Sequence, residues 1–283
     1  MHGDENNAEV IFAVDAGGTF LKSAEVSGGR ILREFPQIPS RSDGTAEEIA
    51  GAFRRVFRFC GNAGKIAVSM PGPFDFKRGI SLMTEKFAAV RGRNPVLLAG
   101  ETREVRFRQD AVSFLDGERL YGAGRGFSRL GGITLGTGLG AAVFTEKGFL
   151  LNELGSPAPE TALWKRPFDG LAAEDWFSAR GLLRLSGGID GKTLEAMARS
   201  GHPEARDVWH RFGCGLARLL EEWAKEFRLD RIVIGGQIAK AFDLFGEPLA
   251  ERNAVPSERG TAAALLGAAE AYHTGQGMKH VNP

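Results

Sequence analysis

A buried strand that runs directly into a glycine turn is the feature that most constrains the fold of this chain. The apolar run Val10-Ile11-Phe12-Ala13-Val14 predicts the strand, and Asp15-Ala16-Gly17-Gly18-Thr19 follows at once. Glycine lacks the Cβ atom that would keep the backbone away from a phosphate, so the amides of Gly17 and Gly18 can bind its oxygens. The Asp15 carboxylate can hold a hydrated Mg²⁺ at the same place. An ordinary hairpin turn is the alternative, because Gly-Gly between two apolar runs is common hairpin chemistry.

Length and charge limit the classes of protein that the chain can belong to. At 283 residues it is long enough for two lobes with one core each, since a single core seldom grows beyond roughly 250 residues. The formal net charge of +1 gives no reason to expect nucleic acid or an anionic membrane as a partner. We expect neither a signal peptide nor a transmembrane segment, because the start is polar and no apolar run is long enough. Cys60 and Cys214 have no partner close in sequence, which predicts reduced thiols in a cytoplasmic protein.

Hydrophobic periodicity predicts an alternation of strands and helices. The expected strands span residues 9–15, 19–27, 30–35, 65–70, 104–109, 131–135, 139–145 and 231–234. The expected helices span residues 45–60, 172–185, 192–199, 204–228 and 258–273, and another begins at Asp110. Thr45 and Glu48 fit a capping box at the start of the first helix. Both halves contain a strand, a glycine turn and a second strand, which indicates two lobes of similar design.

Two further glycine turns follow predicted strands in the second half. The segment Gly136-Thr137-Gly138-Leu139-Gly140-Ala141 formally matches the dinucleotide-binding pattern G-x-G-x-x-A. That fold requires a helix directly after the glycines, whereas residues 141–144 are typical of another strand. A second phosphate-binding hairpin fits better. Gly235-Gly236 ends the strand at 231–234 and supplies a third turn, where adenosine can lie against exposed backbone.

Asp110 is the candidate catalytic carboxylate, because it stands where a predicted strand meets a predicted helix. A carboxylate there can accept a proton from an attacking hydroxyl, and the alternative role is a helix N-cap. The two roles are compatible. Lys22 can approach a phosphate or point into solvent, and the hydroxyls of Thr19 and Thr137 can bind phosphate or only cap a turn. Asp75 is expected to shape its turn.

Five segments resemble, in register, the motifs of the ROK family (repressors, open reading frames and kinases) within the actin/hexokinase superfamily of ATPases. They match the first phosphate motif, the Pro-Gly-Pro loop, the Asn-Asp-Ala motif, the second phosphate motif and the adenosine motif, at residues 15–19, 69–75, 109–111, 133–140 and 232–236. The resemblance spans roughly residues 9 to 272.

The resemblance implies an α/β, two-lobed actin-like and ribonuclease H-like ATPase fold with a central interdomain cleft. The N-terminal lobe would span residues 1–118 and the larger C-terminal lobe residues 119–283, with the last helix packing back on the first lobe. The implied activity is glucokinase-like: ATP- and Mg²⁺-dependent transfer of the γ-phosphoryl group to a hydroxyl of a hexose or hexose derivative, with Asp110 as base. The residues implied to bind ATP are Asp15, Gly17, Gly18, Thr19, Lys22, Gly136, Thr137, Gly138, Gly235 and Gly236. A homodimer is implied as well.

The chain departs from the family pattern at the zinc motif and on the sugar side. No Cys- and His-rich motif follows the second phosphate motif, so we expect no zinc. The sugar is expected to contact Gln109, Asp110 and Glu153, yet Ser156 replaces the family's histidine and residues 85–90 lack its asparagine. Lost polar anchors change which hydroxyls a site distinguishes, so the acceptor stays open. Polyphosphate is the alternative phosphoryl donor.

Two other functions compete with the kinase. One is a non-catalytic ROK-type regulator that binds sugar or nucleotide without a DNA-binding domain, since little sequence precedes the first predicted strand and no basic patch is present. The presence of Asp110 argues against it. The other is a filament-forming or chaperone-like ATPase of the same superfamily.

Overall fold

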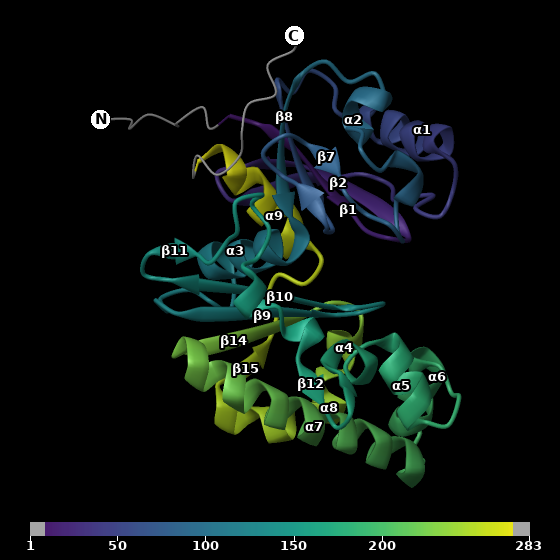
Figure 1. Cartoon of the computed structure of the whole chain (residues 1–283), viewed down its shortest axis with the longest axis vertical. Coiled ribbons are helices and arrows are strands. Elements are labelled where there is room, and N and C mark those ends of the chain that lie inside the picture. The colour runs from purple at the N-terminus through teal and green to yellow at the C-terminus, as the bar shows by residue number, and fades with distance from the viewer. Residues whose placement is uncertain (1–8, 274–283) are drawn as a thin grey trace. The chain divides into compact units, whose positions relative to one another are not determined.

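The computed structural model describes residues 9–273, which form two compact units (Figure 1). Within the described residues, unit 1 comprises residues 9–113, 153–156 and 264–273, and unit 2 comprises residues 114–152 and 157–263. The first break between the units and the predicted division after residue 118 both fall within helix α3 (Asp110–Tyr121). No helix among the described residues has both the length and the apolar character needed to cross a membrane.

Unit 1 is built on a six-stranded mixed sheet. Its strands are β1 (Ile11–Ala16), β2 (Phe20–Ser27), β3 (Arg30–Glu34), β4 (Ile38–Pro39), β5 (Lys65–Met70) and β8 (Glu104–Gln109). The order is β3-β2-β1-β5-β8, with β4 paired to β2. Strand β1 runs antiparallel to β2 and parallel to β5, and β5 runs parallel to β8. The carboxyl ends of β1, β5 and β8 therefore meet at one edge of the sheet.

Helix α1 (Ala46–Phe57) packs its apolar face into the unit 1 core, where Ile49, Phe53 and Val56 are fully buried. The predicted capping box is confirmed: the Thr45 amide donates to Glu48 Oε2 at 2.8 Å, and the Glu48 amide donates to Thr45 Oγ1 at 3.3 Å. The other short elements of unit 1 are β6 (Phe74–Asp75), β7 (Ile80–Ser81), a 3₁₀ turn (Ala88–Val90) and α2 (Pro95–Leu98).

Helix α9 (Ala262–Ala269) and the residues after it are held to the unit 1 sheet by buried and partly buried hydrogen bonds. Arg108 on β8 donates to the Gly267 carbonyl at 2.8 Å, and Arg106 donates to the Ala271 carbonyl at 2.8 Å. The hydroxyl of Tyr272, in the 3₁₀ turn Glu270–Tyr272, donates to a backbone carbonyl on β5 or β8, at 3.0 or 2.9 Å. The helix predicted over 258–273 begins later, at Ala262, and ends in this 3₁₀ turn.

Unit 2 repeats the sheet design of unit 1. Its strands are β9 (Leu130–Leu135), β10 (Leu139–Thr145), β11 (Gly148–Phe149), β14 (Arg231–Gly235) and β15 (Ala254–Pro256), in the order β11-β10-β9-β14-β15. As in unit 1, an antiparallel meander is followed by two parallel strands. The expectation that the two halves share a design is confirmed by this order.

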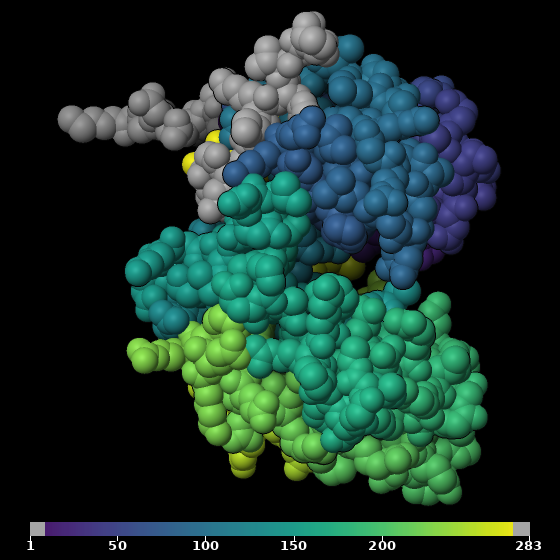
Figure 2. Space-filling view, viewed as in Figure 1, coloured from purple at the N-terminus to yellow at the C-terminus, as the bar shows by residue number. Residues whose placement is uncertain are grey.

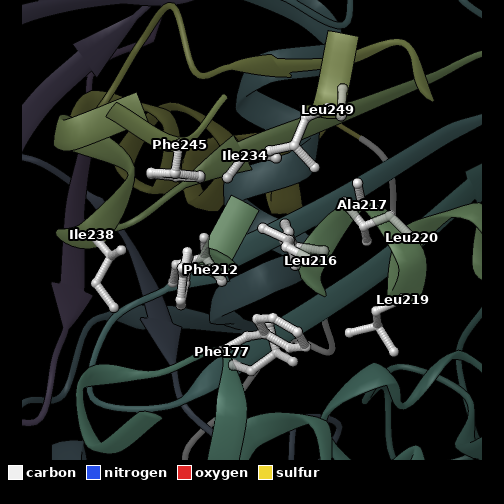
Figure 3. Close-up of a cluster of buried hydrophobic side chains, with 14 of the residues drawn as sticks. Phe177, Phe212, Leu216, Ala217, Leu219, Leu220, Ile234, Ile238, Phe245 and Leu249 are labelled. Atoms are coloured by element: carbon white, nitrogen blue, oxygen red, sulfur yellow. The ribbon is translucent and has the colours of Figure 1, made fainter. Parts of the chain in front are cut away.

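The unit 2 sheet has apolar side chains on both faces because each strand alternates sides. Ile232 and Ile234 join the larger core cluster beneath helix α7 (Pro203–Phe227), whose side chains Phe212 and Leu216 are fully buried there (Figure 3). Val233 faces the other side and packs in a separate cluster with Phe114 of α3. The amphipathic face predicted for the long helix is confirmed as core.

The remaining elements of unit 2 cluster around α7. They are β12 (Pro167–Phe168), β13 (Leu171–Ala172), α4 (Ala173–Trp176), α5 (Ala179–Leu185), α6 (Gly191–Arg199) and α8 (Phe242–Phe245), together with 3₁₀ turns at Pro159–Thr161, Leu163–Lys165, Ile238–Ala241 and Glu247–Arg252. The segment with α5 and α6 forms part of the unit 2 surface seen in Figure 2.

The single helix predicted over 172–185 is wrong, because the structure breaks it into α4 and α5. Phe177 leaves the helical conformation with φ −110° and ψ 48°, and its side chain is buried in the unit 2 core at 1% exposure. The chain turns so sharply here that a Cβ atom on Gly181 would lie 1.9 Å from the Trp176 carbonyl oxygen. Burial of the Phe177 ring outweighs the local helical pattern.

Two helical glycines should respond to alanine in opposite directions. A Cβ atom on Gly51 in α1 would meet nothing within 4 Å, so Gly51→Ala should stabilise the protein by about 0.5–1 kcal/mol through helix propensity. On Gly213 in α7 it would lie 2.1 Å from the Phe245 carbonyl oxygen, so Gly213→Ala should destabilise by roughly 1–3 kcal/mol. Denaturant unfolding of both variants measures the difference. A gain at both positions would contradict the packing of α7 against α8.

Candidate functional site

Parallel pairing brings two acidic side chains to one edge of the unit 1 sheet. Asp15 on β1 is in register with Ser69 on β5, and Met70 on β5 is in register with Gln109 on β8. Asp110 follows Gln109 directly, as the first residue of α3. Ligands of α/β proteins commonly bind beyond the carboxyl ends of such strands.

Asp15 is held by two neighbours on the adjacent strands. Its Oδ1 accepts from the Ser69 hydroxyl at 3.2 Å, and its Oδ2 lies 3.7 Å from Lys22 Nζ. Burial raises the pKa of Asp15 above its usual range, although the charge of Lys22 and the Ser69 hydrogen bond oppose the rise. The side chain of Lys22 therefore lies beside Asp15, where the sequence left phosphate and solvent as alternatives.

The first glycine turn is fixed by its own backbone and by two serines. The Gly17 amide donates to the Phe20 carbonyl at 3.0 Å. The hydroxyls of Ser40 and Ser42 both donate to the Gly18 carbonyl, at 2.7 and 2.6 Å, and the Ser40 amide donates to the Thr19 carbonyl at 2.9 Å. These bonds hold the Gly18 carbonyl in place. Sequence reasoning did not identify the two serines, which are more than twenty residues away along the chain.

Asp110 is the first residue of α3 and is partly exposed. Its Oδ1 accepts from the Ala111 amide at 2.8 Å and from the side-chain amide of Gln109. The Gln109 carbonyl oxygen accepts from the Val112 amide at 2.9 Å, so the whole Gln109 amide is engaged at the start of α3. Both bonds to Asp110 use Oδ1, which makes Oδ2 the better placed oxygen for accepting a proton.

The environment of Asp110 tunes its acidity. Burial, and then the negative charge of Asp15, raise the pKa of Asp110 to about 6. The Ala111 amide and the positive charge of Lys86 oppose this rise. A carboxylate with a pKa close to the working pH is suited to general base catalysis. The N-cap role is filled by Gln109, whose side-chain oxygen accepts from the Val112 amide three residues on, so the N-cap alternative for Asp110 is wrong. The base role stays a prediction.

Lys86 is a neighbour of this edge that sequence reasoning did not identify as a site residue. A Cβ atom placed on Gly18 would lie 3.1 Å from Cδ of Lys86 and 3.6 Å from its Nζ. The lysine therefore runs across the open side of the first glycine turn. In the sequence, the one signal for this role was a lysine within residues 85–90, the segment that lacks the family's asparagine.

The segment expected to bind sugar, residues 153–156, belongs to unit 1 and rests on the loop that follows β6. The Phe76 amide donates to the Leu154 carbonyl at 2.9 Å, and Glu153 is exposed. Asp75 is buried, and its Oδ1 accepts from the amides of Lys77 and Arg78 at 3.1 and 2.9 Å. The expectation that Asp75 shapes its turn is confirmed.

The two glycine turns of unit 2 follow neighbouring parallel strands. Gly235 on β14 is in register with Thr134 on β9, so the turns at 136–138 and 235–236 lie at the same edge of the unit 2 sheet. Gly236 adopts φ +93°, and a Cβ atom there would lie 2.2 Å from the Leu135 carbonyl oxygen. This close approach requires glycine. Thr137 and Gly236 are exposed, so both turns reach the surface of the unit.

Glu174 on α4 supports the second glycine turn and was not predicted. Its Oε2 accepts from the Leu139 amide at 3.0 Å, and a Cβ atom on Gly138 would lie 2.6 Å from the same oxygen. The Ala179 amide donates to the Gly136 carbonyl at 2.8 Å. Helices α4 and α5 therefore fix the turn from the side. No local pattern links these residues in the sequence.

Metal-binding side chains do not cluster in the described part of the chain. No group of three or more His, Cys, Asp or Glu residues within 9–273 is arranged to hold a metal ion. Cys60 and Cys214 are free thiols.

Comparison with known proteins shows which proteins the chain resembles. No family model matches the sequence. Glucokinase of Thermotoga maritima is 27% identical over 277 residues, which cover 86% of each chain. A ROK family glucokinase of Streptomyces griseus, solved with glucose and AMPPNP, has a TM-score of 0.78 at 23% identity and covers 92% of this chain and 98% of its own. An inorganic polyphosphate/ATP-glucomannokinase of an Arthrobacter strain has a TM-score of 0.69 at 25% identity, covering 92% and 97%.

The chain is similar in sequence to glucokinase and in fold to solved ROK family sugar kinases. It has the actin-like α/β fold of those structures, with sheets of matching order in its two units. The fold expected from the five motifs is thereby confirmed, and the relatives are consistent with a ROK sugar kinase. The roles of the individual site residues stay predictions.

The stability of the protein should depend on pH through Asp110. A carboxylate whose pKa is raised on folding destabilises the folded state progressively as pH rises from the unfolded value through about 6. Asp110→Asn keeps an acceptor at the start of α3 but cannot ionise. The variant should therefore melt at a higher temperature than the ligand-free parent at about pH 7.5, and at nearly the same temperature at about pH 4.

Thermal unfolding at the two pH values measures this difference. Asp43→Asn, at an exposed position of unit 1, reports the general effect of removing one negative charge. An equal gain for Asp110→Asn at both pH values would show that Asp110 is not held in a site that raises its pKa.

Proposed function

We propose that the protein is a ROK-type, ATP-dependent carbohydrate kinase that transfers the γ-phosphoryl group to a hydroxyl of a hexose or hexose derivative. The observation that carries the proposal is the unit 1 edge, where a partly exposed carboxylate with a pKa of about 6 lies near a partly exposed glycine turn and the side chain of Lys86. Phosphoryl transfer to an alcohol needs these parts: positioned phosphates and a base for the hydroxyl proton.

In the proposed reaction, Oδ2 of Asp110 accepts the proton of the attacking hydroxyl. The hydroxyl oxygen forms a bond to the γ-phosphorus, and the bond between that phosphorus and the bridging oxygen breaks. ADP leaves with the electron pair. The Gln109 amide and the Ala111 amide hold Oδ1, so the carboxylate keeps its orientation through the step.

The glycine turns are proposed to bind the nucleotide. In unit 1 the turn would bind phosphate through the amides of Gly18 and Thr19, because the Gly17 amide, expected from the sequence to bind phosphate, already donates to the Phe20 carbonyl. Ser40 and Ser42 hold the Gly18 carbonyl back. In unit 2 the turn at 136–138 would bind phosphate, and Gly235-Gly236 would lie against adenosine. Thr19 and Thr137 are exposed and have hydroxyls available for phosphate oxygens.

The acidic edge of unit 1 fits a hydrated Mg²⁺ held by Asp15. Oxygen ligands suit this ion, and the negative charges of Asp15 and Asp110 act on each other strongly enough to raise the pKa of Asp110. A divalent cation beside Asp15 would relieve that repulsion. When bound, Mg²⁺ would supply neutralisation of phosphate charge.

The proposal also includes which sugar accepts the phosphoryl group and which compound donates it. The Streptomyces relative was solved with glucose, and the Arthrobacter relative is named for ATP and polyphosphate as well as for glucose and mannose. A hexose acceptor and ATP as donor are therefore the first candidates. A cytoplasmic location and a homodimer accompany the proposal as expectations. A non-catalytic regulator is the alternative, and the tuned Asp110 carboxylate favours the enzyme.

A panel of sugars with ATP and Mg²⁺ tests the activity. The parent protein should release ADP with at least one hexose or derivative, and excess EDTA should abolish the release. Asp110→Asn should lower kcat by about 10²- to 10⁴-fold, because the variant lacks the base.

ATP binding by both proteins, measured by calorimetry, is the control for folding of the nucleotide site. If neither the parent nor Asp110→Asn released ADP with any sugar while both still bound ATP, the result would contradict the kinase and favour the regulator. Release of ADP without any sugar would favour an ATPase of another kind.

The rate should fall in acid because the base must be deprotonated. With the pKa of Asp110 raised to about 6, kcat/KM should be level above that pH and fall about tenfold for each unit below it. Asp15 raises this pKa, whereas Lys86 and the Ala111 amide lower it. A profile that stays level down to about pH 4.5 would show that another group accepts the proton.

A further inference from the structure

Lys86 is the cation that the proposed mechanism does not yet use. Its side chain lies along the open side of the first glycine turn: a Cβ atom on Gly18 would be 3.1 Å from Cδ, 3.2 Å from Cε and 3.6 Å from Nζ of the lysine. The ammonium is thus close to the backbone that the proposed function assigns to phosphate. Its positive charge also acts on Asp110, because it lowers the pKa of that carboxylate.

The main chain around Lys86 is anchored to the same turn. The amide of Phe87 donates to the Ser42 carbonyl at 2.7 Å, and the Ser42 hydroxyl donates to the Gly18 carbonyl at 2.6 Å. The Phe87 side chain is fully buried, with its ring 6.5 Å from that of Phe53 on α1. Lys86 therefore stands between a buried aromatic anchor and the glycine turn, with its main chain held in place.

The two lysines of this edge differ in what they contact. Nζ of Lys22 lies 3.7 Å from Asp15 Oδ2, so its charge is matched by a carboxylate. Across the described residues, by contrast, no hydrogen bond or ion pair of the Lys86 ammonium is found, and its side chain is only partly exposed. A partly buried ammonium beside a phosphate-binding turn is suited to bind phosphoryl oxygens.

We propose that Lys86 is a catalytic residue whose ammonium contacts the γ-phosphoryl oxygens while the group passes from ATP to the acceptor oxygen at Asp110. The inference rests on the proposed kinase function. Lys86 stays protonated throughout and moves no proton: it donates hydrogen bonds to oxygens whose charge is redistributed as the phosphorus changes partners. Asp110 alone takes up the proton of the hydroxyl.

An acidic group on the acceptor is the competing ligand for Lys86. The lysine occupies the segment in which the family's sugar-contacting asparagine is missing, so it could instead bind a carboxylate or phosphate of a charged sugar. The two roles differ in kinetics. Loss of a contact that is made only in the transition state lowers kcat. Loss of a contact that binds the ground state equally well raises KM and leaves kcat unchanged.

Steady-state kinetics of four proteins test the proposal: the parent, Lys86→Met, Lys86→Arg and the control Lys147→Met. Lys147 is an exposed lysine in the turn between β10 and β11 and has no assigned role. Lys86→Met should lower kcat by about 10²-fold, with KM for ATP and for the sugar changed by less than about threefold. Lys86→Arg should recover part of the loss, because it restores a positive charge, and Lys147→Met should match the parent.

The pH profile supplies a second measurement that loss of structure would not mimic. Since Lys86 lowers the pKa of Asp110, its removal should move the acidic limb of kcat/KM to higher pH in Lys86→Met and return it in Lys86→Arg. Lys147→Met should leave the limb in place.

The outcomes separate this inference from the function on which it rests. An active parent with Lys86→Met at unchanged kcat would overturn the role of Lys86 and leave the kinase intact, as would a rise in sugar KM alone. A parent that phosphorylates no sugar would overturn both. A loss in Lys86→Met with no recovery in Lys86→Arg and no shift of the acidic limb would overturn the catalytic contact as well.

Discussion

Two carboxylates held at one edge of the unit 1 sheet are the constraint around which the site is organised. The parallel registers of β1, β5 and β8 place Asp15 and Asp110 close enough that the charge of one raises the pKa of the other. Coulomb energy between like charges increases as water is excluded, so such a pair needs compensating charge. Lys22 supplies it to Asp15 by a contact of 3.7 Å, and Lys86 supplies it to Asp110 more weakly. The two lysines offset burial and repulsion only in part, because the pKa of both carboxyls stays above its usual range.

Much of this arrangement could be predicted because it depends on local patterns. Each apolar run gave a strand within a residue or two of its true bounds, and the capping box of α1 is carried by residues three apart. Asp15 and Asp110 could be chosen as candidate site residues because each stands at the end of a predicted strand. The hydrophobic face of α7 likewise repeats at helical spacing.

The parts that escaped prediction are held by contacts between segments far apart in sequence. Ser42 and Lys86 reach the glycine turn from 24 and more residues away, and Glu174 reaches Leu139 over 35 residues. No periodicity links such pairs. The prediction of one helix over 172–185 was wrong for the same reason. The Phe177 ring is buried in the unit 2 core, and the backbone leaves the helical conformation at this residue. Local propensity gives way where tertiary packing is worth more.

Gln109 shows why a resemblance cannot fix the acceptor. The family motif suggests that this position contacts sugar, yet here its amide donates to Asp110 Oδ1 while its oxygen caps the Val112 amide, and the side chain is 9% exposed. To bind a sugar hydroxyl, Gln109 would have to release one of these partners. Because the Gln109 side-chain amide donates to the Asp110 carboxylate, it orients that carboxylate and favours its charged form. Discrimination among sugars must then depend on other groups that face the acceptor, and Glu153 is exposed and available for that role.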